Sequence, residues 1–406
     1  MERNFPTIDK MLITTLFLFA MFSMFSISIS QVSAGIGGLL WLIKTHLTKT
    51  WKEQRWPLGI PVLLFALASL LAVADAYDAS YSFKSLKKLL EFLIFFWVLN
   101  CVREESIRNS LSLVLIASAT VAGLLGLYQY WQDLGPTIQI ESSNRPEGSL
   151  STYMTFAGLL MLVGVIALAR GLFQKPMKRW VWASIGIIIL ALLLTHTRQA
   201  WFGFLIGAVF LVFVWRKKVI LLLPIILLVF YTVSPISVQT RIMAPFYGSG
   251  DATLEARINL WQVGWKIFKD YPLTGCGFSC VDLVNSQYPD PLYEKTQDLR
   301  RSVKYLQGMH NNFMQLAVDT GTLGLTAWIG IWVCFFRLLY HRAKTLKEYP
   351  QEGWAIFGSA SAALAFLAGG LFESNLYDAE VVMVLYFIMA LPFSGNENNQ
   401  NDALKK

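Results

Sequence analysis

Polar side chains cluster at the start of one long apolar segment in the last third of the chain. Its sequence, HNNFMQLAVDTGTLGL, opens with His310, which is expected to begin the helix. On an ideal helix an arc of about 100° holds Asn311, Asn312, Gln315 and Asp319. Such groups are costly in hydrocarbon, so they are expected to face a bundle interior or a water-filled cavity and to mark a functional site. The alternative is a helix mouth where His and Asn only satisfy backbone groups.

Two arginines are predicted to reach the same level of the membrane. Arg198, in THTRQAW, begins an apolar segment with Thr197 as a candidate N-cap, where a cation opposes the helix dipole and calls for an anion nearby. Arg257, in EARINLW, lies beside the apolar stripe of an expected amphipathic helix. Each could instead interact only with lipid headgroups, Arg198 by snorkelling.

Arginine and histidine together suit one class of reaction. Arg binds phosphate oxygens through a planar fork and stays charged, so it can hold a diphosphate as it leaves. A neutral His can take a proton from an acceptor hydroxyl. The two arginines and His310 therefore suit transfer of a sugar from a lipid-linked diphosphate.

The composition is that of a polytopic membrane protein. Of 406 residues, 55% are apolar and 15% charged, the mean hydropathy is +0.49, and apolar runs of membrane-spanning length recur. We expect an all-α protein that forms a single integral membrane domain over residues 1–406, with about twelve transmembrane helices. The expected spans are about 11–29, 31–44, 58–74, 84–101, 107–131, 151–170, 179–196, 198–215, 218–235, 311–336, 353–371 and 376–393.

Charge predicts the orientation. The formal charge is +8, and most Lys and Arg fall in short loops on the side of the N-terminus, so both termini are expected in the cytoplasm. Residues 236–309 then form one long loop on the outer side. Within it, an apolar stripe at helical spacing predicts an amphipathic helix at the membrane surface, with Asp251 as a plausible N-cap. The residues of the stripe are Leu254, Ile258, Trp261, Trp265 and Phe268. The sequence GCG after Pro272 predicts a turn.

Neither a cofactor nor a metal site is expected. The four cysteines lack metal-ligand spacing, and no acidic DxD motif stands out in the outer loops, which fits a metal-independent mechanism. Cys276 and Cys280 lie in the outer loop, and whether they form a disulfide is left open because the geometry decides it.

The three segments THTRQAW, EARINLWQVGWKIFKDYPLTGCGF and HNNFMQLAVDTGTLGL together resemble the O-antigen ligase and polymerase superfamily. The resemblance is specific over about 195–325 and follows the rest of the chain by topology. It implies a GT-C-like architecture and a periplasmic site whose essential residues fall on Arg198, Arg257 and His310. The acidic residue nine positions after His310 is Asp319 where Glu is common, and this departure leaves its role open.

The resemblance implies an O-antigen ligase in the bacterial inner membrane. His310 would deprotonate a hydroxyl of lipid A-core, which attacks the anomeric carbon of an undecaprenyl diphosphate-linked glycan in an inverting displacement. Residues expected to help bind substrate are Asn311, Asn312, Gln315, Lys87 and Lys88. Glu373 is considered as a second acid/base group but not selected. Arg241, Arg300 and Arg301 are read as surface charges.

Two other functions are weighed. A polymerase of the same superfamily would join repeat units, but none of the outer-loop arginines has the glycine eleven positions later that some polymerases carry, which mildly favours a ligase. A transporter of a small anion would line a path across the bilayer with polar groups. The ionisable residues gather at one face instead, and no internal repeat is evident. Membrane lipids are expected as further partners, and nucleic acid is not.

Overall fold

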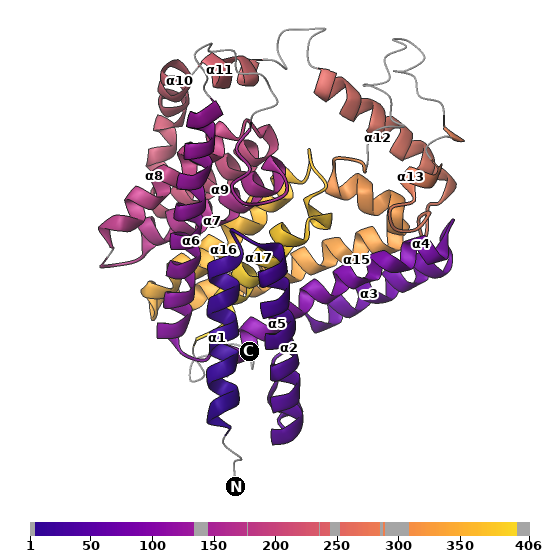
Figure 1. The fold of residues 1–406 in the computed structure, drawn as a ribbon, viewed down its shortest axis with the longest axis horizontal. Helices are drawn as coiled ribbons and strands as arrows, with labels where there is room; N and C mark the ends of the chain where they lie inside the picture. The colour runs from indigo at the N-terminus through magenta and orange to yellow at the C-terminus, as the bar shows by residue number, and fades with distance from the viewer. Residues whose placement is uncertain are drawn as a thin grey trace.

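A computed structural model describes residues 5–133, 145–176, 178–234, 236–243, 252–284, 287–288 and 308–395. Within these ranges the regular structure is helical, with no strand (Figure 1). The predicted all-α class is therefore confirmed for the described residues.

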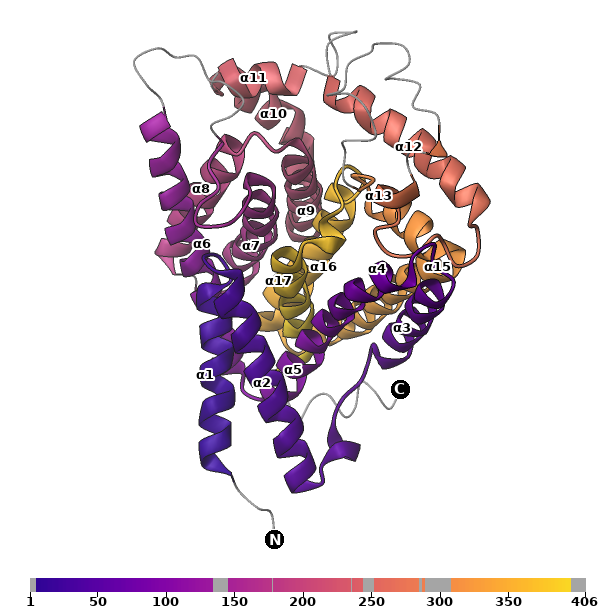
Figure 2. The same ribbon diagram turned by 45° about the vertical axis from the view of Figure 1, so that its right-hand side comes forward.

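The first half of the chain contains helices α1 to α8. Their bounds are α1 Pro6–Phe22, α2 Ile27–Thr48, α3 Gly59–Ala74, α4 Ala79–Phe83, α5 Leu93–Cys101, α6 Glu105–Asp133, α7 Tyr153–Phe173 and α8 Arg179–Leu194. A 3-10 segment, η2, covers Lys84–Phe92 and joins α4 to α5. Helices α1 and α2 pack against each other as a long pair that extends away from the rest of the bundle (Figures 1 and 2).

The second half supplies most of the interior and the helices nearest the candidate site. Their bounds are α9 Arg198–Arg216, α10 Leu223–Val233, α11 Ile236–Met243, α12 Ala252–Asp270, α13 Val281–Val284, α15 Asn312–Ala343, α16 Gly353–Gly369 and α17 Ala379–Ala390. Helices α11 and α12 lie at the end of the molecule opposite the start of α1 (Figures 1 and 2). We call this end the site end.

The core is centred on α7, α16 and α17, which are apolar and buried over most of their length. Small residues let these helices approach closely. An added Cβ at Gly203 of α9 would meet the backbone of Ala365 in α16, and one at Gly158 of α7 would meet Val381 in α17. Small residues at helix crossings are the usual means of packing helices in membranes.

Four helices are long and apolar enough to cross a membrane by length and composition: Ile27–Thr48, Glu105–Gln132, Tyr153–Phe173 and Asn312–Lys347. The chain is thus a helical membrane protein. Most other expected spans coincide with shorter apolar helices, such as Gly59–Ala74, Arg179–Leu194 and Ala379–Phe393. The expected count of twelve spans and the GT-C-like architecture stay predictions.

Some predicted boundaries are wrong. The first hairpin turns at Ser23 to Ser26 instead of near residue 30, because the Ser26 side chain caps α2 by accepting from the Ile29 N–H. The expected span 218–235 divides into a 3-10 segment, η3 Lys217–Leu222, and the short helix α10.

A buried charge cluster ties helices together at the end opposite the site end. Both terminal nitrogens of Arg108 lie 2.6 Å from the Glu352 carboxylate. Arg342 lies 3.9 Å from the same carboxylate, and its Nε donates to the carbonyl of Pro392. Arg108 and Glu352 are 0% and 1% exposed, and the half-exposed Glu105 lies 3.8 Å from Arg108, so Glu352 is the buried carboxylate that compensates this charge.

Helix α15 is interrupted where a loop docks against it. Gly321 has φ 63° and ψ −163°, outside the helical region. The carbonyls of Val318 and Asp319 accept from the N–H groups of Cys276 and Gly277, and the N–H groups of Thr322 and Leu323 donate to the carbonyls of Pro272 and Leu273. The loop therefore satisfies the backbone groups that the interruption frees.

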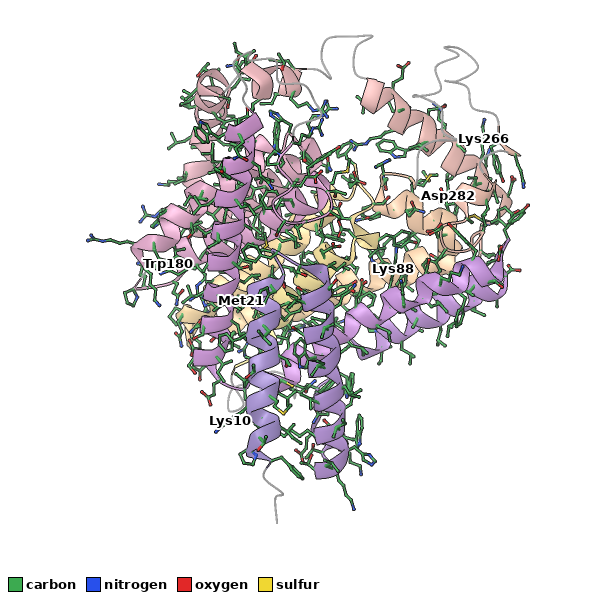
Figure 3. The ribbon with its side chains drawn as sticks, in the orientation of Figure 1. Lys10, Met21, Lys88, Trp180, Lys266 and Asp282 are labelled. Carbon is green, nitrogen blue, oxygen red and sulfur yellow. A yellow bond between two sulfur atoms is a disulfide. The ribbon has the colours of Figure 1, made fainter. Side chains whose placement is uncertain are left out.

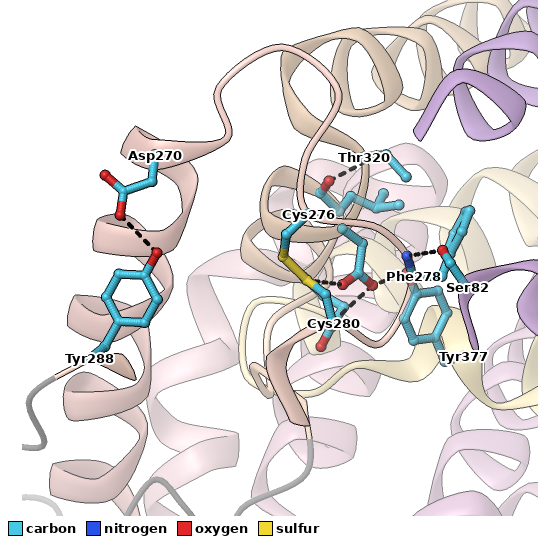
Figure 4. The surroundings of a disulfide bond; sticks show 11 residues. Ser82, Asp270, Cys276, Phe278, Cys280, Tyr288, Thr320 and Tyr377 are labelled. Carbon is cyan, nitrogen blue, oxygen red and sulfur yellow. Dashed lines mark hydrogen bonds between the residues drawn. A yellow bond between two sulfur atoms is a disulfide. The ribbon is translucent and has the colours of Figure 1, made fainter. Parts of the chain in front are cut away.

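The docked loop contains the turn that the glycines predict, since Gly275 and Gly277 both have positive φ. Cys276 and Cys280 form a disulfide within it, which answers the question that the sequence left open (Figure 4). The Phe278 N–H donates to the Ser82 hydroxyl, which joins this loop to α4 (Figure 4).

Helix α12 confirms the predicted helix in the long loop, although Asp251, its expected N-cap, lies outside the described residues. Leu260, Val263 and Ile267 pack against Val318 of α15 and the disulfide loop. Ile258 and Trp265, from the predicted stripe, are exposed on another face. Helix α12 thus has a buried apolar face that packs on α15, in addition to the exposed apolar residues of the predicted stripe.

Candidate active site

Four arginines line one cavity at the site end. Arg145, Arg198, Arg241 and Arg257 line a space of about 140 Å³ together with Tyr153, Met154, His196, Thr197 and Gln199. Arg198 is the first residue of α9, Arg241 comes from α11 and Arg257 from α12. Arg198 and Arg257, 59 positions apart by their numbers, are thereby brought to one site. We call this space the arginine cavity.

The positively charged side chains of the arginine cavity lie close together. No carboxylate is among the described residues that line the arginine cavity. Arg145 stacks over the Tyr153 ring at 4.6 Å, and its Nε is buried without a hydrogen-bond partner. Arg198 lies at a helix N-terminus, where the dipole adds positive potential. Thr197 occupies the predicted N-cap position, but its hydroxyl donates to the Thr195 carbonyl and does not cap the helix.

His196 stays uncharged in this cavity. It lies in the turn between α8 and α9 with φ 51°, and it is 6% exposed. Burial, together with the charges of Arg145 and Arg241, lowers the pKa of His196 to about 4. The fixed positive charge therefore comes from the guanidinium groups alone at neutral pH.

Glu373 connects the arginine cavity to His310. It lies in the loop after α16, and one carboxylate oxygen, Oε1, is 2.9 Å from Nδ1 of His310. The other, Oε2, is 3.6 Å from Nη2 of Arg257 and 3.4 Å from Nε2 of Gln199, the neighbour of Arg198. The Glu373 carboxylate thus contacts His310 and Arg257 directly and reaches Arg198 through its chain neighbour Gln199.

Glu373 is ionised at neutral pH. Burial alone would raise the pKa of Glu373. Three other effects outweigh burial and lower this pKa below its ordinary range: the hydrogen bond from His310, the charges of His310 and Arg257, and the hydrogen bond from the Ser374 N–H. An ionised carboxylate only accepts hydrogen bonds, so Nδ1 of His310 must carry the proton in this pair. Nε2 of a neutral His310 is then left with a lone pair that can accept a proton.

His310 precedes its helix and does not begin it, contrary to the prediction. Asn311 is the N-cap of α15 and accepts from the N–H groups of Phe313 and Met314 at 2.9 and 3.0 Å. His310 itself has φ 45°, a left-handed conformation that is uncommon outside glycine. This conformation directs the imidazole toward Glu373 instead of along the polar face of α15.

The polar residues at the start of α15 hold the loops that carry Glu373 and His310. Asn311 donates to the Leu371 carbonyl, and Asn312 accepts from the Leu376 N–H and donates its own N–H to the Gly370 carbonyl. Gln315 accepts from the Met309 N–H at 2.7 Å. Their side chains thus position the site through the backbone, and their expected contact with substrate stays a prediction.

Asp319 is buried beside two side-chain donors and the Cys276–Cys280 disulfide. Tyr377 donates its hydroxyl to Oδ2 of Asp319, Gln315 donates to the same oxygen at 2.9 Å, and the sulfur of Cys280 is 3.8 Å from Oδ1 (Figure 4). Burial and the nearby Asp319 raise the pKa of Tyr377 well above its ordinary value, so its hydroxyl stays a donor. Asp319 therefore links the disulfide loop to the loop that carries Glu373.

Lys87 and Lys88 line a second, larger cavity of about 1040 Å³, to which Glu373 also contributes. The Lys88 ammonium lies 3.9 Å from the centre of the Tyr377 ring. Figure 3 shows Lys88 in the middle of the molecule, whereas Lys10 and Lys266 lie near opposite ends. Met154 lines both cavities, so the two are neighbours.

Several residues of the site were not selected from the sequence. Arg241 was expected to be a surface charge, Glu373 was considered and passed over, and His196 and Arg145 were not considered as site residues. His196 could have been noticed because it shares the THTRQAW motif with Arg198. Arg300 and Arg301, also expected at the surface, lie outside the described residues.

Among the described residues, no group of three or more His, Cys, Asp or Glu is arranged to hold a metal ion.

Residues 183–329 match the model of the O-antigen ligase family. The match supports a relationship of this segment to the O-antigen ligase and polymerase superfamily. The predicted resemblance is therefore confirmed, and the matched segment includes Arg198, Arg257 and His310. The match supports a ligase or polymerase activity on glycan and lipid substrates in a membrane without distinguishing the two reactions. No curated protein matches the chain.

Proposed function

We propose that the protein is an O-antigen ligase, which transfers a glycan from undecaprenyl diphosphate to a hydroxyl of lipid A-core on the periplasmic side of the inner membrane. The observation that carries the proposal is the link through Glu373 between the arginine cavity and His310. An anion-binding space and a proton acceptor therefore lie side by side. A transfer that releases a diphosphate needs both groups.

The donor diphosphate occupies the arginine cavity. Four guanidinium groups supply the positive charge that a diphosphate requires, and their fork geometry matches phosphate oxygens. As the bond between the anomeric carbon and the diphosphate oxygen breaks, negative charge accumulates on the leaving group. Arg198 and Arg257 stabilise that charge where it develops, so this mechanism requires no metal ion.

His310 acts as the general base. Its Nε2 takes the proton of the acceptor hydroxyl while the oxygen attacks the anomeric carbon from the face opposite the diphosphate, which inverts the configuration. Glu373 accepts from Nδ1–H, holds this tautomer and stabilises the imidazolium that forms. The bonding electrons leave with the diphosphate, and the proton stays on His310 until product release.

The test is a transfer assay with purified protein and an undecaprenyl diphosphate-linked glycan. Lipid A-core and free repeat units are offered separately, with and without EDTA, to the wild type and to His310→Ala. The ligase predicts a product on lipid A-core that resists EDTA and is lost in the variant. Chain extension of repeat units would identify a polymerase instead. Absence of product with both acceptors, from protein that melts cooperatively, would refute glycosyl transfer from this donor and favour anion transport.

A further inference from the structure

The larger cavity has one long apolar wall along α2. Its lining runs from Ile27 to Leu42 of that helix, about 22 Å at 1.5 Å per residue, which is roughly two thirds of a hydrocarbon core. Small residues make room on this wall, since an added Cβ at Gly35 or Gly38 would meet no atom within 4 Å. Gly37, in contrast, packs tightly against Trp97 in the core.

The other end of the cavity is polar and carries more carboxylates than ammonium groups. The ionisable residues among its lining are Glu91, Glu373, Asp378, Glu380, Lys87 and Lys88. This end lies near the start of α2, because Ser149 donates to the Phe25 carbonyl and the adjoining Thr152 and Thr155 line the cavity. The cavity therefore has the shape and polarity of a site for an amphiphile, with its chain along α2 and its head near Glu373.

The chemistry of the polar end distinguishes between the two substrates. The polar end of the larger cavity holds four carboxyl groups against two lysines, whereas the neighbouring cavity has four arginines and no carboxylate among its described lining residues, so a diphosphate is better matched to the arginine cavity. Sugar hydroxyls, which are neutral and donate hydrogen bonds, are well matched to carboxylate oxygens. Glu373 and Met154 lie where the two cavities meet, so a hydroxyl at the polar end of the larger cavity comes next to the Glu373–His310 pair.

We propose that the larger cavity binds the acceptor as a glycolipid, with an acyl chain along Gly35 and Gly38 of α2 and its hydroxyl-bearing sugar among the carboxylates beside Glu373. This inference rests on the proposed function, because it assigns the second substrate of that reaction to a separate site. Donor and acceptor then approach the Glu373–His310 pair from two neighbouring cavities.

Filling the apolar wall tests the proposal. Gly38→Leu and Gly35→Leu place a side chain in open space, so neither disturbs the packing of α2. Gly186→Leu on α8 is the matched control, because an added Cβ there also meets nothing within 4 Å and the residue does not line the cavity. The probes are a disaccharide glycolipid with a diazirine in its acyl chain and an undecaprenyl diphosphate with a diazirine in its polyprenyl chain.

Photolabelling is mapped by mass spectrometry on purified, folded protein. The glycolipid should label residues 27–42 in the wild type and in Gly186→Leu. Labelling should fall about 15- to 60-fold in Gly38→Leu. Each methylene group of the acyl chain that loses its contact lowers the affinity about fourfold, and a leucine side chain displaces two or three such groups. In transfer assays the same variant should raise KM for the acceptor and leave KM for the donor unchanged.

Two results would overturn the proposal. One is labelling of residues 27–42 by the polyprenyl probe with loss in Gly38→Leu, which would make the wall a donor site. The other is glycolipid labelling that is unchanged in both α2 variants. Labelling requires no turnover, so a failure of the proposed function is seen separately: transfer would be absent while glycolipid labelling still depends on Gly38.

Discussion

Nδ1 of His310 lies 2.9 Å from Oε1 of Glu373, and the two residues come from loops that are 63 positions apart in the chain. The other oxygen of Glu373 faces Arg257 at 3.6 Å. A single carboxylate therefore sets both the tautomer of the proposed base and the position of one proposed phosphate ligand.

Replacing Glu373 tests its role as a positioning residue. Glu373→Gln keeps the shape but can also donate to Nδ1, so the wrong tautomer of His310 becomes accessible, and we expect kcat to fall about 10²- to 10⁴-fold. The pH profile of kcat should shift, because the imidazolium loses its negative partner. Glu373→Asp should recover part of the activity. Glu348→Gln, at an exposed position near the other end of α15, is the control. Unchanged kcat and pH profile in Glu373→Gln would contradict the role.

Arg145 and Arg241 are expected to contribute to donor binding beside the two arginines of the family motifs. Removing one charge-assisted hydrogen bond costs about 1.5–3 kcal/mol, so Arg145→Ala and Arg241→Ala should each raise KM for the donor about 10- to 100-fold. KM for the acceptor should not change. Arg216→Ala, at the other end of α9 where the guanidinium stacks on Trp215, serves as the comparison. If all three substitutions raised KM for the donor equally, the cause would be the loss of positive charge in general and not a contact in the arginine cavity, and the prediction would be wrong.

Acid should destabilise the protein through His196. The pKa of His196 is about 4 in the folded protein and about 6.5 in the unfolded chain, so the unfolded state binds the proton more readily. The stability that neutral His196 contributes is present above pH 6.5 and is lost as the pH falls toward 4, by about 3 kcal/mol in total.

His196→Asn tests this contribution. Asparagine tolerates the left-handed conformation at this position and does not titrate. The unfolding free energy of the variant should therefore depend less on pH between about 6.5 and 4 than that of the wild type. Parallel pH curves for the two proteins would show that another group is responsible.

Neutralising Glu352 should destabilise the opposite end of the bundle. Glu352→Gln leaves Arg108 without its buried carboxylate partner and with only the half-exposed Glu105 at 3.8 Å, which costs about 3 kcal/mol. Denaturation in detergent would measure the loss, while the folded fraction should keep its KM values because the cluster lies far from the site. Replacing both partners, as Arg108→Met with Glu352→Leu, should recover much of the stability. If Glu352→Gln were as stable as the wild type, the Arg108 guanidinium would have to reach water, and the prediction would be wrong.

Local pattern predicted much of this fold, and tertiary contacts account for what it missed. Apolar periodicity located the helices, and the glycines of GCG predicted the turn before α13. Glu373 carries no local signal of its importance, because its role depends on a loop after α16 reaching His310 and α12. The N-cap at Asn311 likewise decides that His310 lies outside the helix, which the periodicity of the following residues could not indicate. The approach of Arg198, Arg257 and His310 is now seen, while their catalytic roles remain predictions.

The interruption at Gly321 has a consequence for how the site tolerates change. The loop that follows α12 exchanges backbone hydrogen bonds with α15 on both sides of the interruption, so main-chain atoms set the placement of Arg257 relative to His310. A Cβ at Gly321 would collide with the carbonyl of Leu273, and one at Gly275 would collide with the backbone of Asp319. Side chains along this seam can therefore diversify during evolution while the spacing of the active-site groups is inherited unchanged, provided that these two glycines are kept.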